Sequence, residues 1–285
     1  MNHLLCFGFG YSAQVFAARL DKHAWKISAT SRDPGGITEI EAKGFRGLLF
    51  DGKLQIAPNV THLLISAPPD ENGDPVLRLF QEQLQRLSKQ LQWVGYLSTT
   101  GVYGDRGGEW VDEESPLEPN TTRGHRRLEA ERSWLKLCND HGLPVHLFRL
   151  AGIYGPGRNQ LLTVLNGRAK RIVKPGQIFS RIHVDDIAGV LAASIAKPNP
   201  GRAYNICDDE PCPPQVVVEY AADLLGLPLP PEIPFEQAEL SPMVRSFYAD
   251  SKRVSNTRMK SELGNKLLYP NYREGLLALK SQLTR

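Results

Sequence analysis

The chain has 285 residues, of which 41% are hydrophobic and 23% charged, so it can bury a full α/β core and is not a disordered protein. Its formal net charge of +3 is too small and too dispersed to indicate a nucleic-acid-binding protein. The first predicted strand begins at His3, and no later apolar run reaches the roughly 18 residues of a membrane span. We therefore expect a cytoplasmic protein with no membrane partner.

The four cysteines, Cys6, Cys138, Cys207 and Cys212, show neither zinc-site spacing nor a C-x-x-C pair. We expect them to be structural thiols, and we expect no metal site.

Short apolar runs alternate with helical patterns along the first half of the chain. Between two such runs, apolar residues recur every three or four positions from Val76 to Leu91, which is typical of a helix packed on a sheet. Parallel strands need crossover connections, so the alternation predicts an α/β fold of the Rossmann type with a doubly wound parallel sheet. The runs predicted as strands are residues 3–7, 25–30, 47–50, 62–66, 93–98 and 145–150.

The character of the sequence changes after about residue 155, where proline and glycine become frequent and strand signals become rare. We expect residues 1–154 to form the dinucleotide-binding domain, to which residues 183–206 return. Residues 155–182 and 207–285 are then expected to form a smaller, irregular substrate lobe.

A glycine motif, Gly8-Phe9-Gly10-Tyr11-Ser12-Ala13, follows the first strand and precedes the helical stretch 14–20. In such a G-x-G-x-x-A motif the first glycine permits a tight turn and the second lets a pyrophosphate approach the backbone. The small third residue lets the helix pack on the strand. A merely structural glycine turn is the alternative, but the position between strand and helix favours dinucleotide binding.

The choice of cofactor is expected at the end of the second strand, where a carboxylate would hold the ribose of NAD. The strand ends instead in Ser31-Arg32, a hydroxyl and a guanidinium that suit a 2′-phosphate. NADP is therefore favoured, and NAD stays the alternative if Arg32 is a solvated loop charge. Asp51, after the third strand, is placed either to contact the adenine or to form a turn.

Four further motifs follow in order: LSTTGVYG at 97–104, FRLAGIYGPG at 148–157, RIHVDDIA at 181–188 and YNI at 204–206. With the glycine motif they resemble the extended short-chain dehydrogenases of the NAD-dependent epimerase/dehydratase branch. In closer detail the chain is similar to their atypical YeeZ-like subgroup.

The resemblance implies functions for several residues. Ala67, Gly152 and Ile153 would line the cofactor site, the last two near the nicotinamide. Thr99 falls at the position of the family's catalytic Ser/Thr, where it would hydrogen-bond a substrate carbonyl or hydroxyl. Residues 183–186 would be structural, holding the C-terminal lobe against the sheet.

The Tyr-x-x-x-Lys motif of the family is replaced in this chain. Aligning Ala130-Glu131 with the family's Ala-Glu puts Arg123 at the tyrosine position and Arg127 at the lysine position. Arginine, with a pKa above about 12, cannot serve as the proton donor. Either both arginines are solvated, or they jointly face an anion such as a cofactor phosphate or an acidic substrate.

Tyr103 and Tyr154 are the hydroxyls that would replace the missing donor, although each also belongs to a packing motif of the family. The residues together favour an NAD(P)-dependent oxidoreductase or epimerase-like enzyme on a small, anionic metabolite. The alternative is a non-catalytic NADP-binding sensor or regulatory protein. A homodimer is also expected, because residues 76–91 and the helix with Leu128, Trp134 and Leu135 pair across a two-fold axis in many relatives; in a monomer the same residues would cover the sheet.

Overall fold

The structure, a computed structural model, describes residues 1–283. Within that range no helix is long and apolar enough to cross a bilayer. The strands are β1 (Asn2–Phe7), β2 (Trp25–Ser31), β3 (Arg46–Leu49), β4 (His62–Ile65), β5 (Trp93–Thr99), β6 (Trp110–Val111), β7 (Val145–Leu150), β8 (Gly152–Tyr154), β9 (Arg171–Val173), β10 (Arg181–His183), β11 (Ala203–Ile206), β12 (Glu232–Pro234) and β13 (Arg253–Val254). The helices are α1 (Tyr11–Arg19), α2 (Pro34–Ala42), α3 (Pro75–Leu87), η1 (Thr100–Tyr103), α4 (Thr122–His141), α5 (Gln160–Leu165), α6 (Val184–Ala196), α7 (Pro214–Leu225), η2 (Phe235–Gln237), α8 (Pro242–Phe247), α9 (Thr257–Leu263) and α10 (Tyr272–Leu283).

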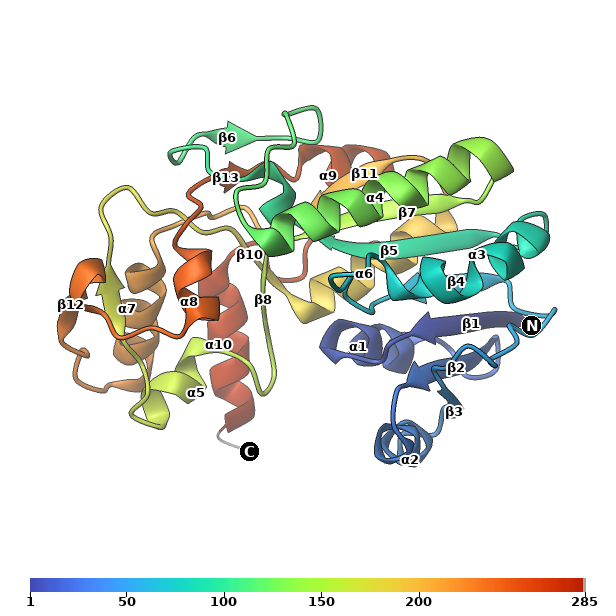
Figure 1. Cartoon of the computed structure of the whole chain (residues 1–285). Coiled ribbons are helices and arrows are strands. Elements are labelled where there is room, and N and C mark those ends of the chain that lie inside the picture. The colour runs from blue at the N-terminus through green and yellow to red at the C-terminus, as the bar shows by residue number, and fades with distance from the viewer. Residues whose placement is uncertain (284–285) are drawn as a thin grey trace. The chain divides into compact units, whose positions relative to one another are not determined.

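A parallel sheet dominates the first part of the chain (Figure 1). In the part of the chain that the structure describes, it has seven strands in the order β11-β7-β5-β4-β1-β2-β3. The predicted Rossmann-type fold is confirmed, and each predicted strand is found within one residue at either end. The order reverses between β1 and β4, where Leu4 pairs with His62. In such sheets the carboxyl ends of the strands at the reversal are the usual ligand site.

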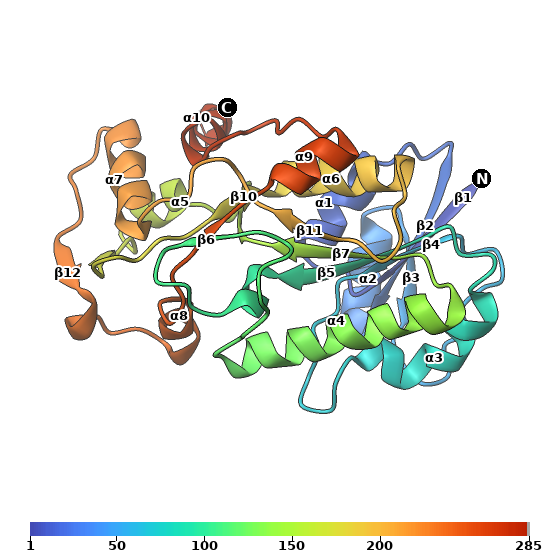
Figure 2. The same ribbon diagram turned by 90° about the horizontal axis from the view of Figure 1, so that it is seen from above.

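Helices cover both faces of this sheet (Figure 2). On one face, α3 and α4 bury a core in which the rings of Phe7 and Phe80 stack with centroids 5.3 Å apart. On the other face, the indole of Trp93 donates to the Ser194 hydroxyl of α6 at 3.0 Å. Successive side chains of a strand point to opposite faces, so a strand buried on both faces is apolar throughout, as the sequence of β5 is.

The apolar residues on which the homodimer was predicted lie inside this core. Val76, Phe80 and Leu84 of α3 and Trp134 of α4 have no exposed surface, and Leu128 is buried as well. A second copy cannot contact side chains that the chain's own sheet already covers. The homodimer therefore stays a prediction, and these residues do not support it.

The chain divides into two compact units of nearly equal length. Unit 1 comprises residues 1–99, 125–149 and 187–204, and unit 2 comprises residues 100–124, 150–186 and 205–285. The segment 100–124, which was expected in the dinucleotide-binding domain, thus groups with unit 2.

Unit 2 has its own apolar core, formed by α5, α7, α10 and β8, with Leu161, Ala221 and Leu276 completely or almost completely buried. Tyr154 of β8 packs so closely on α10 that a Cβ at Gly275 would lie 2.1 Å from the tyrosine hydroxyl. Short parallel pairs, β8 with β10, β9 with β12 and β6 with β13, hold the remaining segments.

A buried ion pair fixes α4 in unit 1. Glu131 of α4 is 1% exposed, and its carboxylate lies 2.9 Å from the guanidinium of Arg149 on β7. The hydroxyl of Ser98 on β5 donates to the same carboxylate at 2.5 Å. Two strands thereby hold one carboxylate, and any sliding of α4 along the sheet would leave a charge buried without its partner.

We predict that Glu131→Ala lowers the free energy of unfolding by about 3–5 kcal/mol, because the buried guanidinium of Arg149 would lose the carboxylate that neutralises it. Glu129→Ala, two residues earlier on the same helix, removes an ion pair to Arg132 in which both side chains are more than half exposed. This control should cost at most about 1 kcal/mol. Urea denaturation followed by circular dichroism measures both, and equal losses would contradict the assignment.

Candidate functional site

The first turn of the glycine motif depends on a glycine at position 8. Gly8 has a φ of +80°, a left-handed conformation that costs other residues about 1–2 kcal/mol. A Cβ at this position would also lie 3.1 Å from the backbone nitrogen of Ala67, which follows β4. The Gly8 amide donates to the hydroxyl of Thr30 on β2 at 2.9 Å. The motif therefore lies where the order of the sheet reverses, as the ligand site requires.

Helix α1 begins directly after this turn, and its first amides have no side-chain cap. Gly10 is the N-cap residue, has an ordinary φ of −75° and carries no side chain that could accept from these amides. A Cβ there would only touch the Ser66 hydroxyl at 3.7 Å, so the fold itself does not demand a glycine. Uncapped amides at a helix N-terminus bind anions, and a glycine leaves room for a phosphate. Tyr11 opens the helix, while Ser12 and Ala13 are buried against the sheet, as predicted for the small third residue.

The end of β2 presents a basic side chain beside a second helix start. Ser31 is the last residue of β2, and Arg32 follows it with an exposed side chain. Asp33 is the nearest carboxylate, but it caps α2 by accepting from the Gly36 amide at 2.9 Å. A Cβ at Gly36 would lie 2.1 Å from the Ser31 hydroxyl. The end of β2 therefore carries a hydroxyl and a guanidinium, and the one carboxylate beside them in the sequence, Asp33, serves as the cap of α2.

Asp51 lies in the turn after β3. Its carboxylate accepts from the backbone amide of Lys53 at 3.0 Å, which is the turn geometry named as one alternative for this residue. Ala67 donates its amide to the Phe7 carbonyl at 2.9 Å and so closes the floor of the glycine turn with its backbone.

The two arginines that the sequence predicted at the tyrosine and lysine positions lie in different environments. Arg123 is exposed in the first turn of α4. Arg127 is 8% exposed and donates to the Leu97 carbonyl at 2.8 Å and to the Tyr96 hydroxyl at 3.1 Å. The two arginines were predicted either to be solvated together or to face an anion together. Arg127 does neither, because it is buried and its hydrogen bonds go to β5. It ties α4 to β5 and leaves Arg123 as the arginine that solvent and ligands can reach.

Thr99 ends β5 and is partly buried, and η1 begins with the next residue. The two tyrosines considered as donors lie in unit 2 and are buried. Tyr103 donates to the side-chain oxygen of Asn205 at 2.7 Å. Burial raises the pKa of the Tyr154 hydroxyl further above its ordinary value. The structure does not support a catalytic function for either tyrosine, since one is committed to a buried hydrogen bond and the other holds its proton too strongly.

Gly152 and Ile153 belong to β8 in unit 2, where Gly152 is exposed and pairs with Arg181 of β10. In the neighbouring motif, Asp186 accepts from the amides of Leu268 and Tyr269 at 2.5 and 3.1 Å. A carboxylate so engaged pins the loop before α10, which is a structural function.

Two buried titratable groups of unit 2 were missed from the sequence. Lys252 donates to the Gly104 carbonyl at 2.6 Å, and burial lowers the pKa of its ammonium while Asp250 opposes the shift. Asp208 is 1% exposed, and burial raises the pKa of its carboxyl to about 8, with Arg181 partly opposing the shift. Its Oδ2 atom has no hydrogen-bond partner among residues 1–283. Nothing in the local sequence marks either residue, because their burial depends on segments distant in the chain.

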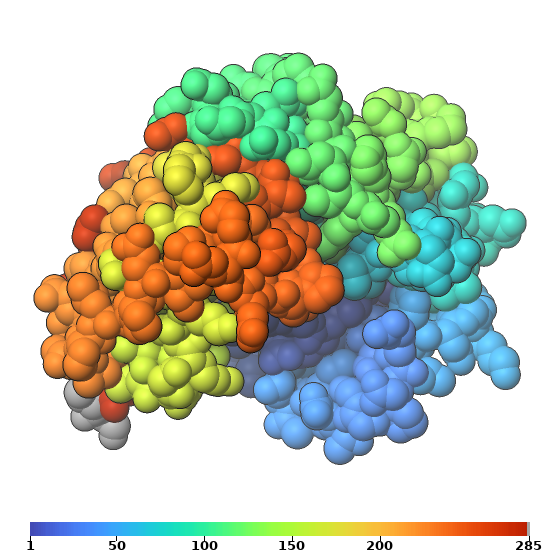
Figure 3. All heavy atoms as spheres, turned by 60° about the vertical axis from the view of Figure 1, so that its left-hand side comes forward, coloured from blue at the N-terminus to red at the C-terminus, as the bar shows by residue number. Residues whose placement is uncertain are grey.

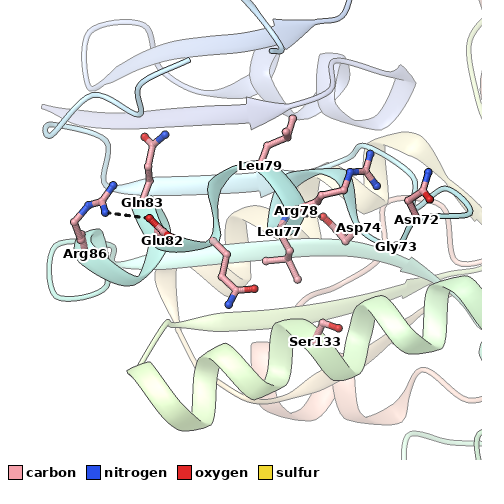
Figure 4. Close-up of a pocket in the computed structure, with 11 residues that line it drawn as sticks. Asn72, Gly73, Asp74, Leu77, Arg78, Leu79, Glu82, Gln83, Arg86 and Ser133 are labelled. Atoms are coloured by element: carbon pink, nitrogen blue, oxygen red, sulfur yellow. Dashed lines mark hydrogen bonds and ion pairs between the residues drawn. The ribbon is translucent and has the colours of Figure 1, made fainter. Parts of the chain in front are cut away.

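A groove of about 710 Å³ runs along the outer side of α3 in unit 1 (Figure 4). Two of its charged side chains form exposed pairs, Arg78 with Asp70 at 2.9 Å and Arg86 with Glu82 at 3.8 Å, and such pairs are weak. The carboxylate of Asp74, which also lines the groove, caps α3 and accepts from the Trp134 indole at 3.0 Å. Because Asp74 serves to hold α3 and α4, we place the candidate active site at the carboxyl ends of the strands instead.

Comparison with known proteins agrees with this geometry. The model of the NAD dependent epimerase/dehydratase family matches residues 72–207. Protein YeeZ of Escherichia coli K12 is 27% identical over 95% of this chain and 97% of its own length. A solved, functionally unknown conserved protein of Silicibacter pomeroyi DSS is 53% identical over the full length of both chains, with a TM-score of 0.93. The chain is thus similar to the NAD dependent epimerase/dehydratase family over residues 72–207.

Solved epimerases and dehydratases in complex with NAD share the fold of the chain, at TM-scores of 0.72 to 0.78 and identities of 16% to 19%. The 3-diazoavenalumate denitrifying reductase of a Streptomyces species is 28% identical over 59% of this chain and 55% of its own length. These solved structures agree with the chain in fold.

The raised pKa of the Asp208 carboxyl predicts how the stability of the protein changes with pH. Because the folded chain raises the pKa to about 8, it keeps a proton that the unfolded chain loses above about pH 4. The contribution of the neutral carboxyl is complete below about pH 4 and is lost as pH rises through about 8.

Asp208→Asn should therefore flatten the fall in the free energy of unfolding between about pH 5 and about pH 9. Asp223→Asn, at an exposed residue of α7 in unit 2, is the control and should keep the slope of the native protein. Urea denaturation at several pH values measures the slope, and identical slopes for native protein and Asp208→Asn would refute the assignment.

Proposed function

We propose that the chain is an NADP-dependent oxidoreductase that acts on a small anionic metabolite and does not use the Tyr/Lys proton relay of its family. The observation that carries the proposal is the environment of the two arginines. Arg127 is hydrogen-bonded to β5, whereas Arg123 is an exposed, permanent cation at the position proposed for the usual proton donor. A permanent cation binds an anion and cannot supply a proton near neutral pH.

The preference for NADP rests on the end of β2. Arg32 is exposed there, Ser31 adds a hydroxyl, and Asp33 is occupied as the cap of α2. A guanidinium and a helix N-terminus together favour a 2′-phosphate, and a ribose hydroxyl of NAD would find no unused carboxylate.

When bound, the cofactor supplies hydride transfer, and the chain's own residues position the reactants. The amides of α1 and the backbone beside Gly8 would hold the pyrophosphate. Thr99, at the end of β5, would orient a substrate carbonyl or hydroxyl by a hydrogen bond, and Arg123 would neutralise the charge of the substrate. The names of the relatives include a reductase of 3-diazoavenalumate, which supports a reductive reaction on an anion.

A non-catalytic NADP sensor is the second candidate, and one observation favours it. Each candidate donor from the sequence is unsuitable: a guanidinium such as that of Arg123 is not a general acid, Tyr103 donates its hydroxyl to Asn205, and burial raises the pKa of the Tyr154 hydroxyl. In a sensor, occupancy by the dinucleotide would matter and turnover would not.

The cofactor preference is tested by titration. NADPH should bind more tightly than NADH by about 1.5–3 kcal/mol, which is roughly 10- to 150-fold in Kd, because a charge-assisted contact is lost with NADH. Arg32→Ala should remove most of this difference. Arg46→Ala, an exposed arginine that begins the neighbouring strand β3, is the control and should leave it unchanged. Equal binding of NADH and NADPH by the native protein would refute the preference.

The reaction class is tested by NADPH oxidation with two groups of substrates. We expect no ordinary turnover, of about 1–10³ per second, with nucleotide-sugar ketones, and measurable turnover with small carboxylates that carry a reducible bond. Thr99→Ala should abolish the second activity, whereas Thr100→Ala, the adjacent control, should retain it. Arg123→Tyr with Arg127→Lys should create weak ketone reduction, since general acid catalysis contributes about 10²–10⁴-fold.

Ordinary turnover of nucleotide sugars by the native protein would contradict the loss of the Tyr/Lys relay. Tight NADPH binding without oxidation by any carboxylate would favour the sensor.

A further inference from the structure

Helix α8 of unit 2 presents a group of apolar side chains to solvent. Met243 is 64% exposed, Phe247 49% and Val244 39%. The helix is anchored at its end by Tyr248, which is buried and stacks on Phe235 with ring centroids 5.1 Å apart. Figure 3 shows this orange segment at the molecular surface. Single exposed apolar residues are normal, but three on one short helix indicate a binding surface.

The start of α4 lies against this helix. The guanidinium carbon of Arg123 is 5.8 Å from the centroid of the Phe247 ring, and the Asn120 amide donates to the Ala249 carbonyl at 3.4 Å. Gly124, the next residue, packs closely on η1, because a Cβ there would lie 2.9 Å from the Gly101 carbonyl. The start of α4 thus lies beside both α8 and η1.

Further cationic side chains lie near α8. Lys174 and Arg245 lie over the Phe235 ring at 5.2 and 5.0 Å, and their hydrogen bonds go to backbone carbonyls of Tyr248 and Ala238. Lys174 also interacts electrostatically with the Asp105 carboxylate. Arg245 of α8 and Arg123 beside Phe247 favour an anion over a cation at this helix.

We propose that Arg123 and α8 form the subsite for a small carboxylate that carries an aromatic ring, an inference that rests on the proposed function and specifies its substrate. The planar guanidinium of Arg123 pairs with the carboxylate through two parallel hydrogen bonds. The ring of the substrate packs on Phe247 and Met243, since aromatic rings and thioethers both make favourable contacts with an aromatic face. The 5.8 Å between guanidinium and ring requires a short spacer between the two groups of the substrate.

Three commercial compounds test the subsite by calorimetry on the full chain saturated with NADP. Trans-cinnamate has both groups, cinnamamide lacks the charge and crotonate lacks the ring. We expect cinnamate to bind about ten-fold or more tightly than either of the others. Arg123→Gln should remove the difference between cinnamate and cinnamamide, and Phe247→Ser the difference between cinnamate and crotonate. Arg126→Gln, on the same helix, should change neither.

Affinity for NADPH, measured on each variant, shows that the protein is folded. Equal binding of cinnamate and cinnamamide by the native protein, or the same loss in Arg126→Gln, would overturn the subsite. So would the absence of binding by all three compounds, which would leave α8 as a protein-docking surface. Selective cinnamate binding without any NADPH oxidation would uphold the subsite and refute the enzyme. Turnover of aliphatic carboxylates without selectivity for cinnamate would uphold the enzyme and refute the subsite.

Discussion

The carboxylate of Glu131 is the constraint on which the interpretation of the site depends. It is buried between Ser98 of β5 and Arg149 of β7, and a buried charge tolerates no displacement from its partners. The contacts of Glu131 therefore determine which residues of α4 lie against which residues of the sheet. With that register fixed, Arg127 must lie one helical turn before Glu131, and Arg123 one turn before Arg127.

Three charged residues follow one another on α4 at four-residue spacing. Glu131 is neutralised by an ion pair with Arg149, Arg127 donates to a carbonyl and a phenol of β5, and Arg123 is exposed in the first turn of the helix. Four-residue spacing places them on one side of α4, but the position along the helix decides what each contacts. The residue that the sequence alignment put at the family's lysine position is therefore a structural tie in this chain.

The sequence predicted the sheet well because each buried strand is an uninterrupted apolar run between turn residues, as in residues 145–150. The glycine turn was predictable for the same local reason, since Gly8 needs a left-handed backbone. The burial of Arg127 was not predictable, because a sequence records the distance between two arginines and not the carbonyl of Leu97 that one of them meets. Asp208 and Lys252 were missed because their neighbours come from other segments of the chain: the Asp208 amide donates to the Arg181 carbonyl, and Lys252 donates to the Gly104 carbonyl.

The discontinuous composition of unit 1 has a consequence for biosynthesis. Its sheet begins with β1 at the N-terminus, yet its last edge strand, β11, extends from residue 203. On a ribosome the first two thirds of the chain must therefore emerge before that edge can be paired. Until α6 arrives, Trp93 lacks the serine hydroxyl to which its indole donates and the helix that covers its face of the sheet. Non-local closure of this kind is slow and leaves apolar surface uncovered, so the nascent chain is a natural client for a chaperone.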